Sequence, residues 1–317
     1  MKEFIKKQLK KNDMLYFMLK NLKNKITNNN EIYFDRKIVD KKLKTFSKIG
    51  IEKHTNGEQI LISLTSFPAR INDVKYTIYS LLNQTYRPDK VILWLGAEQF
   101  PKRENELPKG LVKLKQNGLQ INFVKDIKSF KKLVPALQQY TNFLIVTVDD
   151  DIFYPSTLLE NLYKEHIKYP DCIIAHRAHR IKFKNGSIAK YSDWESEIKN
   201  KYMTPSYLNF LTGGAGAMYH SSLLHSDITN EELFMKYCPK ADDVWFNAMA
   251  VRQGTRIKIV NGGSYPLCYI NPENEMAGIN TLGSYNNGQN GNDKQIQCVL
   301  EHYPDVLKRL KDEFYGK

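Results

Sequence analysis

The stretch FLIVTVDDDIFYP, residues 143–155, decides the fold. It begins as an almost wholly apolar run, which is typical of a strand buried on both faces of a parallel sheet. It then runs into three consecutive aspartates, Asp149, Asp150 and Asp151. Adjacent carboxylates repel one another, and burial at a sheet end makes each of them costly unless a positive group lies nearby. The stretch therefore predicts a buried strand that leads directly into a charged site.

Similar short apolar runs recur along the chain and are rich in Ile, Val and Leu. They lie at 60–64, 91–95, 121–124, 172–175 and 257–260, and helical patterns separate them at about 71–84, 130–140, 156–168 and 242–253. Alternating strands and helices predict an α/β fold, in which helices sandwich a mostly parallel sheet through right-handed crossovers. Ligands of such sheets gather at the carboxyl ends of the strands, which is where the three aspartates are expected.

The length and composition favour one large domain with appendages. The chain has 317 residues, of which 42% are hydrophobic, and no apolar run approaches the length of a membrane span. Its four cysteines form no CxxC pair, as is typical of reduced thiols in a cytoplasmic protein. We divide the chain into a basic helical extension and linker at 1–50, one large α/β domain at 58–303 and a C-terminal tail at 304–317.

The net charge of +13 is concentrated at the N-terminus. Residues 1–50 hold 14 Lys/Arg and 5 Asp/Glu, which gives 14 − 5 = +9. The mildly basic remainder argues against a nucleic-acid partner bound along the whole protein. Residues 1–28 have apolar side chains at helical spacing between lysines. Such a helix either packs on the rest of the protein or rests on an anionic membrane surface.

Two explanations compete for the three aspartates. Helix capping is the first, but TLLE at 157–160 has the form of a capping box, in which Thr157 caps the next helix and Glu160 reaches back. The aspartates come too early for that role. The second explanation is a hard divalent cation, and carboxylate oxygens suit Mg²⁺ or Mn²⁺, which often share ligands with substrate phosphates. We therefore expect metal and diphosphate binding here.

Four motifs in this order resemble a known family. VTVDDDIFYP (146–155) is preceded by ISLTSFPARI (62–71) and followed by GGAGAMY (213–219) and ADDVWFNAMA (241–250). Together they resemble the GT-A-fold glycosyltransferases, most closely bacterial family 2 enzymes that build surface polysaccharides. The resemblance covers about residues 58–303. It implies inverting transfer of a sugar from a nucleotide-diphosphate donor to a hydroxyl of a glycan or lipid-linked glycan, in capsule or lipopolysaccharide synthesis.

The resemblance also implies roles for the aspartates. Asp149 would lie near the nucleotide ribose and the metal, Asp151 would bind Mn²⁺ or Mg²⁺, and Asp150 would belong to the donor site without a defined contact. The metal would neutralise charge on the departing diphosphate.

Other residues are candidates for donor binding. Thr65 and Ser66 offer hydroxyls, and Arg70 offers a planar fork that suits phosphate. Lys132, favoured over Lys131, is placed to reach the diphosphate or donor sugar. The alternatives are a turn with a surface arginine and a solvated helix face. WLGAEQFP (94–101) replaces the aspartate-rich turn usual in the family, so Glu98 is the candidate for a contact with the base.

The later motifs supply the remaining candidates. Gly213 and Gly214 permit close backbone approach, either as a wall around the sugars or as a plain turn. ADDVWFNAMA opens a helix that one aspartate is expected to cap, which leaves the other free to take the acceptor's proton. We assign that role to Asp243, with Asp242 second. Asn292 or Asp293 is expected on the rim of the site.

Two other classes of protein remain open. A hydrolase or phosphotransferase would use the aspartates as nucleophile and metal ligands. A non-catalytic protein would bind lipid or nucleic acid through its basic arm, but that class leaves both acidic motifs unexplained.

Overall fold

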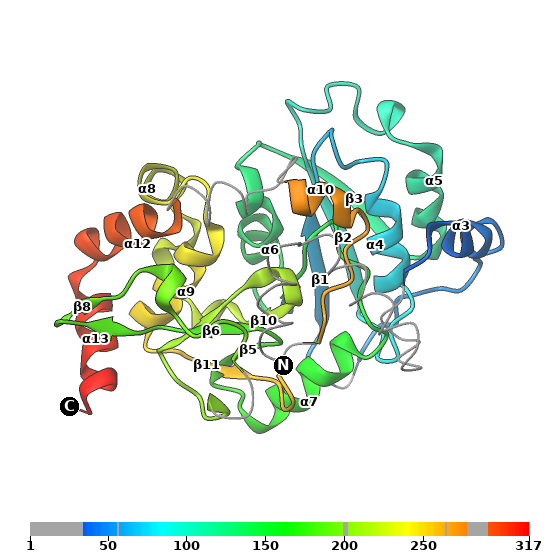
Figure 1. Cartoon of the computed structure of the whole chain (residues 1–317). Coiled ribbons are helices and arrows are strands. Elements are labelled where there is room, and N and C mark those ends of the chain that lie inside the picture. The colour runs from blue at the N-terminus through cyan, green and yellow to red at the C-terminus, as the bar shows by residue number, and fades with distance from the viewer. Residues whose placement is uncertain (1–33, 56, 199–201, 264, 278–290, 317) are drawn as a thin grey trace, which may run out of the picture.

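The computed structural model describes residues 34–55, 57–198, 202–263, 265–277 and 291–316 (Figure 1). All four motifs of the predicted catalytic domain lie within these ranges. The helix predicted at 1–28 and the polar linker predicted at 26–31 lie outside them.

A seven-stranded sheet with the order β11-β5-β10-β4-β1-β2-β3 forms the centre of the described residues. Its strands are β1 Ile60–Thr65, β2 Lys90–Gly96, β3 Leu119–Val124, β4 Leu144–Thr147, β5 Cys172–Ala175, β10 Ala217–Tyr219 and β11 Arg256–Ile259. Neighbouring strands pair in parallel, except that β10 runs antiparallel to both β4 and β5. The prediction of a mostly parallel α/β sheet is therefore confirmed.

Strand β10 was not expected. The motif that contains it, GGAGAMY, was interpreted as a glycine-rich turn or wall, yet Ala217 pairs with Thr147 of β4 on one side and Ala175 of β5 on the other. Its three residues are fully buried but too few to show a strand pattern in the sequence.

Helices cover both faces of the sheet, as predicted. One face carries α4 Val74–Leu81, α5 Lys109–Val112 and α7 Leu158–Lys168; the other carries α6 Val134–Gln139, α9 Asp242–Gln253, α12 Gly291–His302 and α13 Pro304–Tyr315. Strand β1 shows the alternation, because Leu61 packs with the second group while Ile60 and Ile62 pack with the first. Each of these side chains is fully buried and contributes roughly 1.5–3 kcal/mol relative to exposure to water.

Smaller elements surround the sheet. They include η4 Lys128–Lys132, α8 Glu231–Tyr237, α10 Pro272–Ala277, and two antiparallel pairs, β6 Ala178–Arg180 with β9 Asn209–Leu211 and β7 Phe183–Lys184 with β8 Ser187–Ile188. The β6–β9 pair continues directly from β5 and β10, so it extends beyond the carboxyl end of β5.

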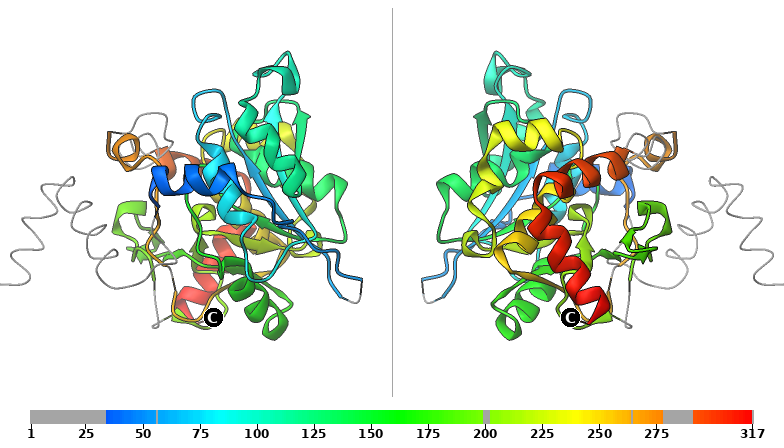
Figure 2. Two further views of the ribbon diagram at one scale, coloured as in Figure 1. Left: turned by 90° about the vertical axis from the view of Figure 1, so that its right-hand side faces the viewer. Right: turned by 90° about the vertical axis from the view of Figure 1, so that its left-hand side faces the viewer.

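The segments on either side of 58–303 pack against it. Helix α3 (Arg36–Lys44) lies against α4 (Figure 2), where Tyr76 donates a 2.8 Å hydrogen bond to Asp40. At the other end, Val306 and Leu310 of α13 are buried in the core beside α9. The residues predicted as a tail thus include a packed helix, and the division into domains stays a prediction.

The order of the strands explains where a ligand site forms. From β1 the chain adds β2 and β3 on one side and then returns to place β4 on the other, so β1 lies at a topological switch point. Ser63 and Thr147 are register partners near the ends of β1 and β4. The residues that follow these two strands are therefore brought together at the sheet edge where α/β proteins bind ligands.

None of the described helices is both long enough and apolar enough to cross a lipid bilayer.

Candidate active site

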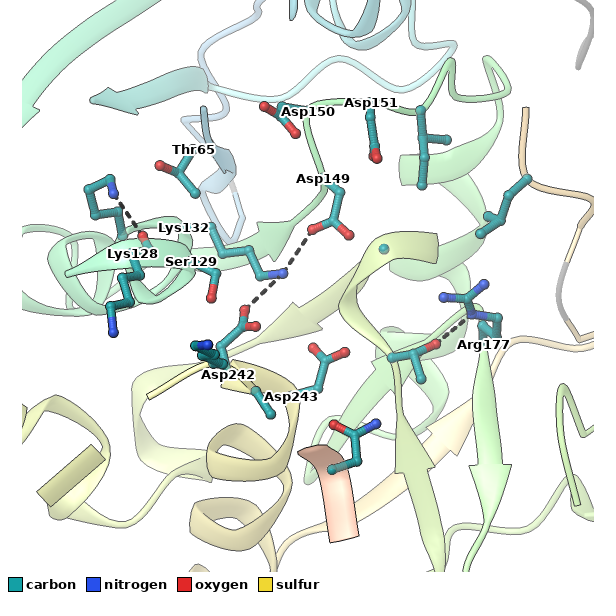
Figure 3. Close-up of a pocket in the computed structure, with 18 of the residues that line it drawn as sticks. Thr65, Lys128, Ser129, Lys132, Asp149, Asp150, Asp151, Arg177, Asp242 and Asp243 are labelled. Carbon is teal, nitrogen blue, oxygen red and sulfur yellow. Dashed lines mark hydrogen bonds and ion pairs between the residues drawn. The ribbon is translucent and has the colours of Figure 1, made fainter. Parts of the chain in front are cut away.

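A cleft of about 910 Å³ opens at the carboxyl ends of the parallel strands. All predicted site residues except Gly213 and Glu98 line it, namely Thr65, Ser66, Arg70, Lys132, Asp149, Asp150, Asp151, Gly214, Asp242 and Asp243, with the rim candidates Asn292 and Asp293. Figure 3 shows the two acidic motifs facing one another across this cleft. The structure thus brings four separate sequence motifs to one place.

Each of the three aspartates is paired with a cation of the chain itself. A carboxylate oxygen of Asp149 lies 2.8 Å from the ammonium of Lys132. Arg70 Nη1 lies 2.8 Å from both Asp150 and Asp151. The positive charge that the sequence required is therefore supplied by lysine and arginine. A metal is therefore not required to account for the cluster, and metal binding stays a prediction.

The hydroxyl of Ser66 adds a second contact to Asp150, donating a hydrogen bond of 2.5 Å. Arg70 and Ser66 therefore hold the middle carboxylate from the loop after β1. Burial nevertheless raises the pKa of Asp150, whereas in Asp149 the opposing effect of Lys132 outweighs burial and lowers the pKa. For Arg70, burial works against the charge, but Asp151 and Asp150 raise its pKa overall.

Backbone contacts fix the loop that carries the aspartates. The hydroxyl of Thr77 donates a 2.8 Å hydrogen bond to the carbonyl of Asp150. The amide of Ile270 donates a 2.8 Å hydrogen bond to the carbonyl of Asp151. The amide of Asp149 donates a 2.8 Å hydrogen bond to the hydroxyl of Tyr154. That hydroxyl donates a 2.8 Å hydrogen bond to the carbonyl of Gly214 in the glycine motif. Three separate segments thus hold this loop, which positions the carboxylates before any ligand binds.

The capping box predicted at the next helix does not form. Thr157 occupies the N-cap of α7 but makes no side-chain cap hydrogen bond. Glu160 instead accepts a 2.7 Å hydrogen bond from Thr85 and pairs with Lys164 one helical turn later. These two surface partners compete for the carboxylate that a capping box would need.

Lys132 joins the two acidic motifs. Its ammonium lies 2.8 Å from Asp149 and 2.9 Å from Asp242, and the residue is 4% exposed (Figure 3). Burial opposes its charge, but Asp149, Asp242 and Asp243 raise the pKa of Lys132 well above its usual value. Its carbonyl accepts a 2.6 Å hydrogen bond from Ser63 in β1, which anchors η4 to the sheet. Contact of Lys132 with a donor stays a prediction.

Lys131 points to a different partner. It pairs with Asp126 and donates 2.8 Å to the carbonyl of Lys128, and burial lowers its pKa. Two consecutive lysines thus serve two different carboxylate groups in the cleft.

Asp242 and Asp243 open helix α9, but the expected capping role was wrong. Ala241 is the N-cap, and no side chain there makes a cap hydrogen bond. Asp243 instead accepts a 3.1 Å hydrogen bond from the amide of Gly213. Burial, together with Asp242 and Asp149, raises the pKa of Asp243 to about 7, although Lys132 opposes the rise. A helix N-terminus normally lowers the pKa of a carboxylate, but burial and the other acids of the cleft outweigh that effect here.

The two glycines lie between the acidic motifs. A Cβ atom built on Gly214 would stand 2.7 Å from a carboxylate oxygen of Asp149, which is closer than real contacts allow. A Cβ on Gly213 would stand 3.0 Å from Asp243 and 3.2 Å from Lys132. Close approach to charged groups, and not a left-handed backbone, therefore explains glycine at these positions.

The base-side candidates are placed differently from the prediction. Glu98 is exposed and does not line the cleft; its carboxylate accepts a 2.9 Å hydrogen bond from the amide of Asp126. Gln99 and Asp126 line the cleft in its place. Thr65 also lines the cleft, and its hydroxyl donates a 2.9 Å hydrogen bond to the carbonyl of Trp94 in β2.

Sequence reasoning missed one wall of the cleft. It is formed by Arg177, His179, Tyr191, Glu197, Lys240, Leu267 and Tyr269, and the rim candidates Asn292 and Asp293 also line the cleft. Two of these residues, Arg177 and His179, come from the motif AHRAHR (175–180), which follows a predicted strand. His176 is buried with Nε2 3.1 Å from the carbonyl of Leu158, whereas His179 faces the cleft and burial lowers its pKa to about 4.

The donor set suits a metal that a substrate helps to hold. Among the described residues, no group of three or more His, Cys, Asp or Glu side chains is arranged around a metal position. Asp149 and Asp151 nevertheless both line the cleft, and carboxylate oxygens are the ligands that Mg²⁺ prefers. Mg²⁺ often takes only one or two carboxylates and completes its shell with waters and substrate phosphates. The residues therefore fit such an ion, but not a metal held by protein groups alone.

The fold and the cleft together define a mixed α/β protein with a charged cleft at the carboxyl ends of its parallel strands. No protein-family model matches the chain, and no curated protein matches it either. Among solved structures, "Crystal structure of S. aureus TarS 1-349" is similar, with a TM-score of 0.39 and 13% sequence identity. The match covers 65% of this chain and 59% of that chain. A likeness at this level concerns the arrangement of the elements and says nothing about the reaction.

Proposed function

We propose that the protein is a glycosyltransferase that moves a sugar from a nucleotide-diphosphate donor to an acceptor hydroxyl. The observation that carries the proposal is the position of Lys132, which lies within 2.9 Å of both acidic motifs. The first motif, Asp149–Asp151, follows β4 next to the switch point, where a diphosphate would bind. The second motif contains Asp243, a carboxylate suited to proton transfer. Transfer to a hydroxyl needs these two functions side by side in one cleft.

Asp243 is the proposed general base. A carboxylate whose pKa is about 7 accepts a proton near neutral pH more readily than an ordinary aspartate does. In the reaction, the acceptor oxygen bonds to the anomeric carbon and its proton passes to Asp243. The bond from that carbon to the diphosphate breaks, and the electron pair leaves with the diphosphate. An inverting outcome is proposed from the family resemblance.

The charges of the cleft favour a divalent cation. Its described lining contains eight Asp/Glu and six Lys/Arg, so 8 − 6 leaves two net negative charges when all are ionised. A diphosphate would bring further negative charge into this space. We therefore propose that Mg²⁺ or Mn²⁺ binds through Asp151 and Asp149; when bound, it would neutralise charge on the leaving diphosphate.

The chain's own cations hold the carboxylates ready. Arg70 fixes the last two aspartates of the triplet, and Lys132 fixes Asp149. The pair with Lys132 favours the ionised form of Asp149, which is the form that binds a metal ion.

The biological setting is proposed from the sequence. The resemblance favours a role in capsule or lipopolysaccharide synthesis, with a glycan or lipid-linked glycan as acceptor. A cytoplasmic enzyme that binds the inner membrane face through residues 1–28 would stay near such an acceptor. Co-sedimentation with anionic and neutral vesicles, for the full chain and for a chain without residues 1–28, tests this attachment. Equal sedimentation of the two chains at low salt would rule it out.

The reaction itself is tested with a panel of nucleotide sugars. Hydrolysis of the donor and transfer to simple sugars are measured for the wild-type protein, Asp243→Asn and Asp171→Asn. Asp171 is an exposed aspartate outside the cleft, so its variant controls for the loss of one carboxylate. Turnover of at least one donor that fails only in Asp243→Asn supports the proposal. Phosphate release from simple phosphate esters without any sugar transfer would favour the hydrolase instead.

A further inference from the structure

Arg177 is held firmly at the edge of the cleft. It lies between β5 and β6, and its carbonyl accepts a 3.1 Å hydrogen bond from the amide of Thr212. The Nε of Arg177 donates a 2.5 Å hydrogen bond to the hydroxyl of the same threonine. Because one residue fixes both the main chain and the side chain, the plane of the guanidinium is set in advance. Figure 3 shows Arg177 on the opposite side of the cleft from Lys132.

The charge of Arg177 differs from that of the buried cations across the cleft. Arg70 pairs with two aspartates, Lys132 with two, and Lys131 with Asp126. Within the described residues, Arg177 has no ion pair, and Thr212 is its hydrogen-bond partner. A guanidinium has five N–H donors, and the contact with Thr212 uses one of them, in a residue that lines the cleft.

Burial makes an uncommitted charge costly, which is why such groups are usually paired. Arg177 is only partly exposed, and burial opposes its charged form. The tyrosine and carboxyl groups around it, Tyr269, Glu197, Asp243 and Asp149, nevertheless raise its pKa overall. The guanidinium is therefore charged, and the nearest acids act on it from beyond ion-pair distance.

The space before Arg177 is kept open by Gly214. A Cβ atom on this glycine would lie 3.6 Å from Nη2 of Arg177, on the side that faces Asp149. Absence of a side chain there leaves room for an oxyanion between the arginine and the two acidic motifs.

We propose that Arg177 binds an oxyanion of a substrate, a phosphate or a carboxylate, on the wall of the cleft opposite Lys132. The guanidinium fork matches both groups, because each offers two oxygens in one plane. The anion has two sources: the diphosphate of the donor or an acidic group on the acceptor. This inference rests on the proposed function for the identity of the substrates, but the contact itself does not depend on catalysis.

Binding calorimetry with three probes tests the contact. Inorganic pyrophosphate represents the donor diphosphate, glucuronic acid represents an acidic acceptor, and glucose is the neutral reference. The proteins are wild type, Arg177→Gln, Arg177→Lys and Arg87→Gln. Arg87 lies outside the cleft lining, so its variant loses the same charge without touching the site. Thermal unfolding of each variant confirms that it is folded.

We expect Arg177→Gln to bind one of the two anions at least about tenfold more weakly, since hydrogen bonds to charged groups are the stronger kind. Arg177→Lys should recover part of the loss, and Arg87→Gln should match the wild type. A loss for pyrophosphate assigns the contact to the donor, and a loss for glucuronic acid assigns it to the acceptor. Unchanged binding of both anions, no anion binding by the wild type, or an equal loss in Arg87→Gln would overturn the proposal.

These measurements separate the two proposals. A chain that transfers no sugar but loses anion binding in Arg177→Gln contradicts the glycosyltransferase assignment alone. A chain that transfers sugar and binds both anions normally in Arg177→Gln contradicts the role of Arg177 alone.

Discussion

The ammonium of Lys132 lies 2.9 Å from a carboxylate oxygen of Asp242, although the two residues come from separate motifs of the sequence. This pair ties the helix that opens with Asp242 to the strand end that carries Asp149. The fold and the chemistry of the cleft should therefore both respond when the groups that meet here are changed.

Replacement of Lys132 by methionine should destabilise the fold. It leaves two carboxylates beside each other without the buried cation, and breaking a buried pair from one side costs about 3–5 kcal/mol. Urea unfolding measures the loss. Lys132→Arg keeps the charge and should lose less. The control is Lys164→Met, which removes an exposed partner of Glu160 and should change stability by about 1 kcal/mol or less. Equal losses at the two lysines would contradict the bridging role.

Activity should depend on the protonation of Asp243. A base with a pKa of about 7 is protonated in acid, so kcat/KM should fall as the pH drops below about 7. Asp243→Asn should lower kcat by about 10²-fold or more and remove this limb of the profile, while donor affinity changes little. Rate profiles of both proteins against pH provide the check. Near-normal turnover in Asp243→Asn, or its loss in Asp242→Asn alone, would move the role away from Asp243.

The raised pKa of Asp243 should also make the stability of the fold depend on pH. The pKa of Asp243 is about 7 in the folded protein against an ordinary value of 3.8. A raised folded pKa means that the contribution of this group is fully present below about pH 4 and is lost as the pH rises through about 7. Asp243→Asn cannot ionise, so it should be more stable than the wild type at about pH 8 and lose that advantage near pH 4. Denaturant titrations at the two pH values decide the matter, and an advantage independent of pH would argue against ionisation as its cause.

Removal of divalent cations should weaken donor binding. The cleft is net negative by the count of its described lining residues, so a diphosphate without a metal meets repulsion. Calorimetry with UDP, GDP, CDP and ADP should show at least about tenfold weaker binding in EDTA for the preferred nucleotide. Asp151→Asn should reduce the dependence on metal, and Asp171→Asn should not. Equal affinity with and without EDTA would leave Arg70 and Lys132 as the cations that suffice.

Much of the fold was predictable because the deciding signals are local. Each of the six apolar runs became a strand, and the runs are long enough to show burial on both faces. Strand β10 was not predicted, because its three residues are a short run that follows three glycines. Its antiparallel direction depends on pairing with β4 and β5, which the sequence does not show.

The site was predictable as a set of motifs but not as a set of pairs. The sequence shows that Asp150 needs a positive neighbour, yet Arg70 becomes that neighbour only because β1 and β4 are adjacent in the sheet. Capping at Asp242 and Thr157 was predicted from local patterns, but Asp242 pairs with Lys132 and the other member of the expected capping box, Glu160, pairs with Thr85 and Lys164. Arg177 could not be singled out from the sequence. It stands out only in the folded cleft, where the described residues give it no acidic ion-pair partner.

Helix α3 limits how far the chain can be shortened. Arg36 lies 2.6 Å from both Asp73 and Asn271, and Asn271 returns a 2.7 Å hydrogen bond to Asp73, so three distant segments close into a ring. Next to this ring, Ile270 packs with Val39 of α3 and its amide holds the carbonyl of Asp151.

A protein trimmed to begin at residue 58 would retain every predicted motif and still lose the packing of Val39 on Ile270, the residue whose amide holds the acidic loop. Trimming should therefore stop before residue 34, even when only the motif-bearing part is wanted for expression or crystallisation. Helix α3 is, in practical terms, part of the smallest piece of the chain that would keep the cleft intact.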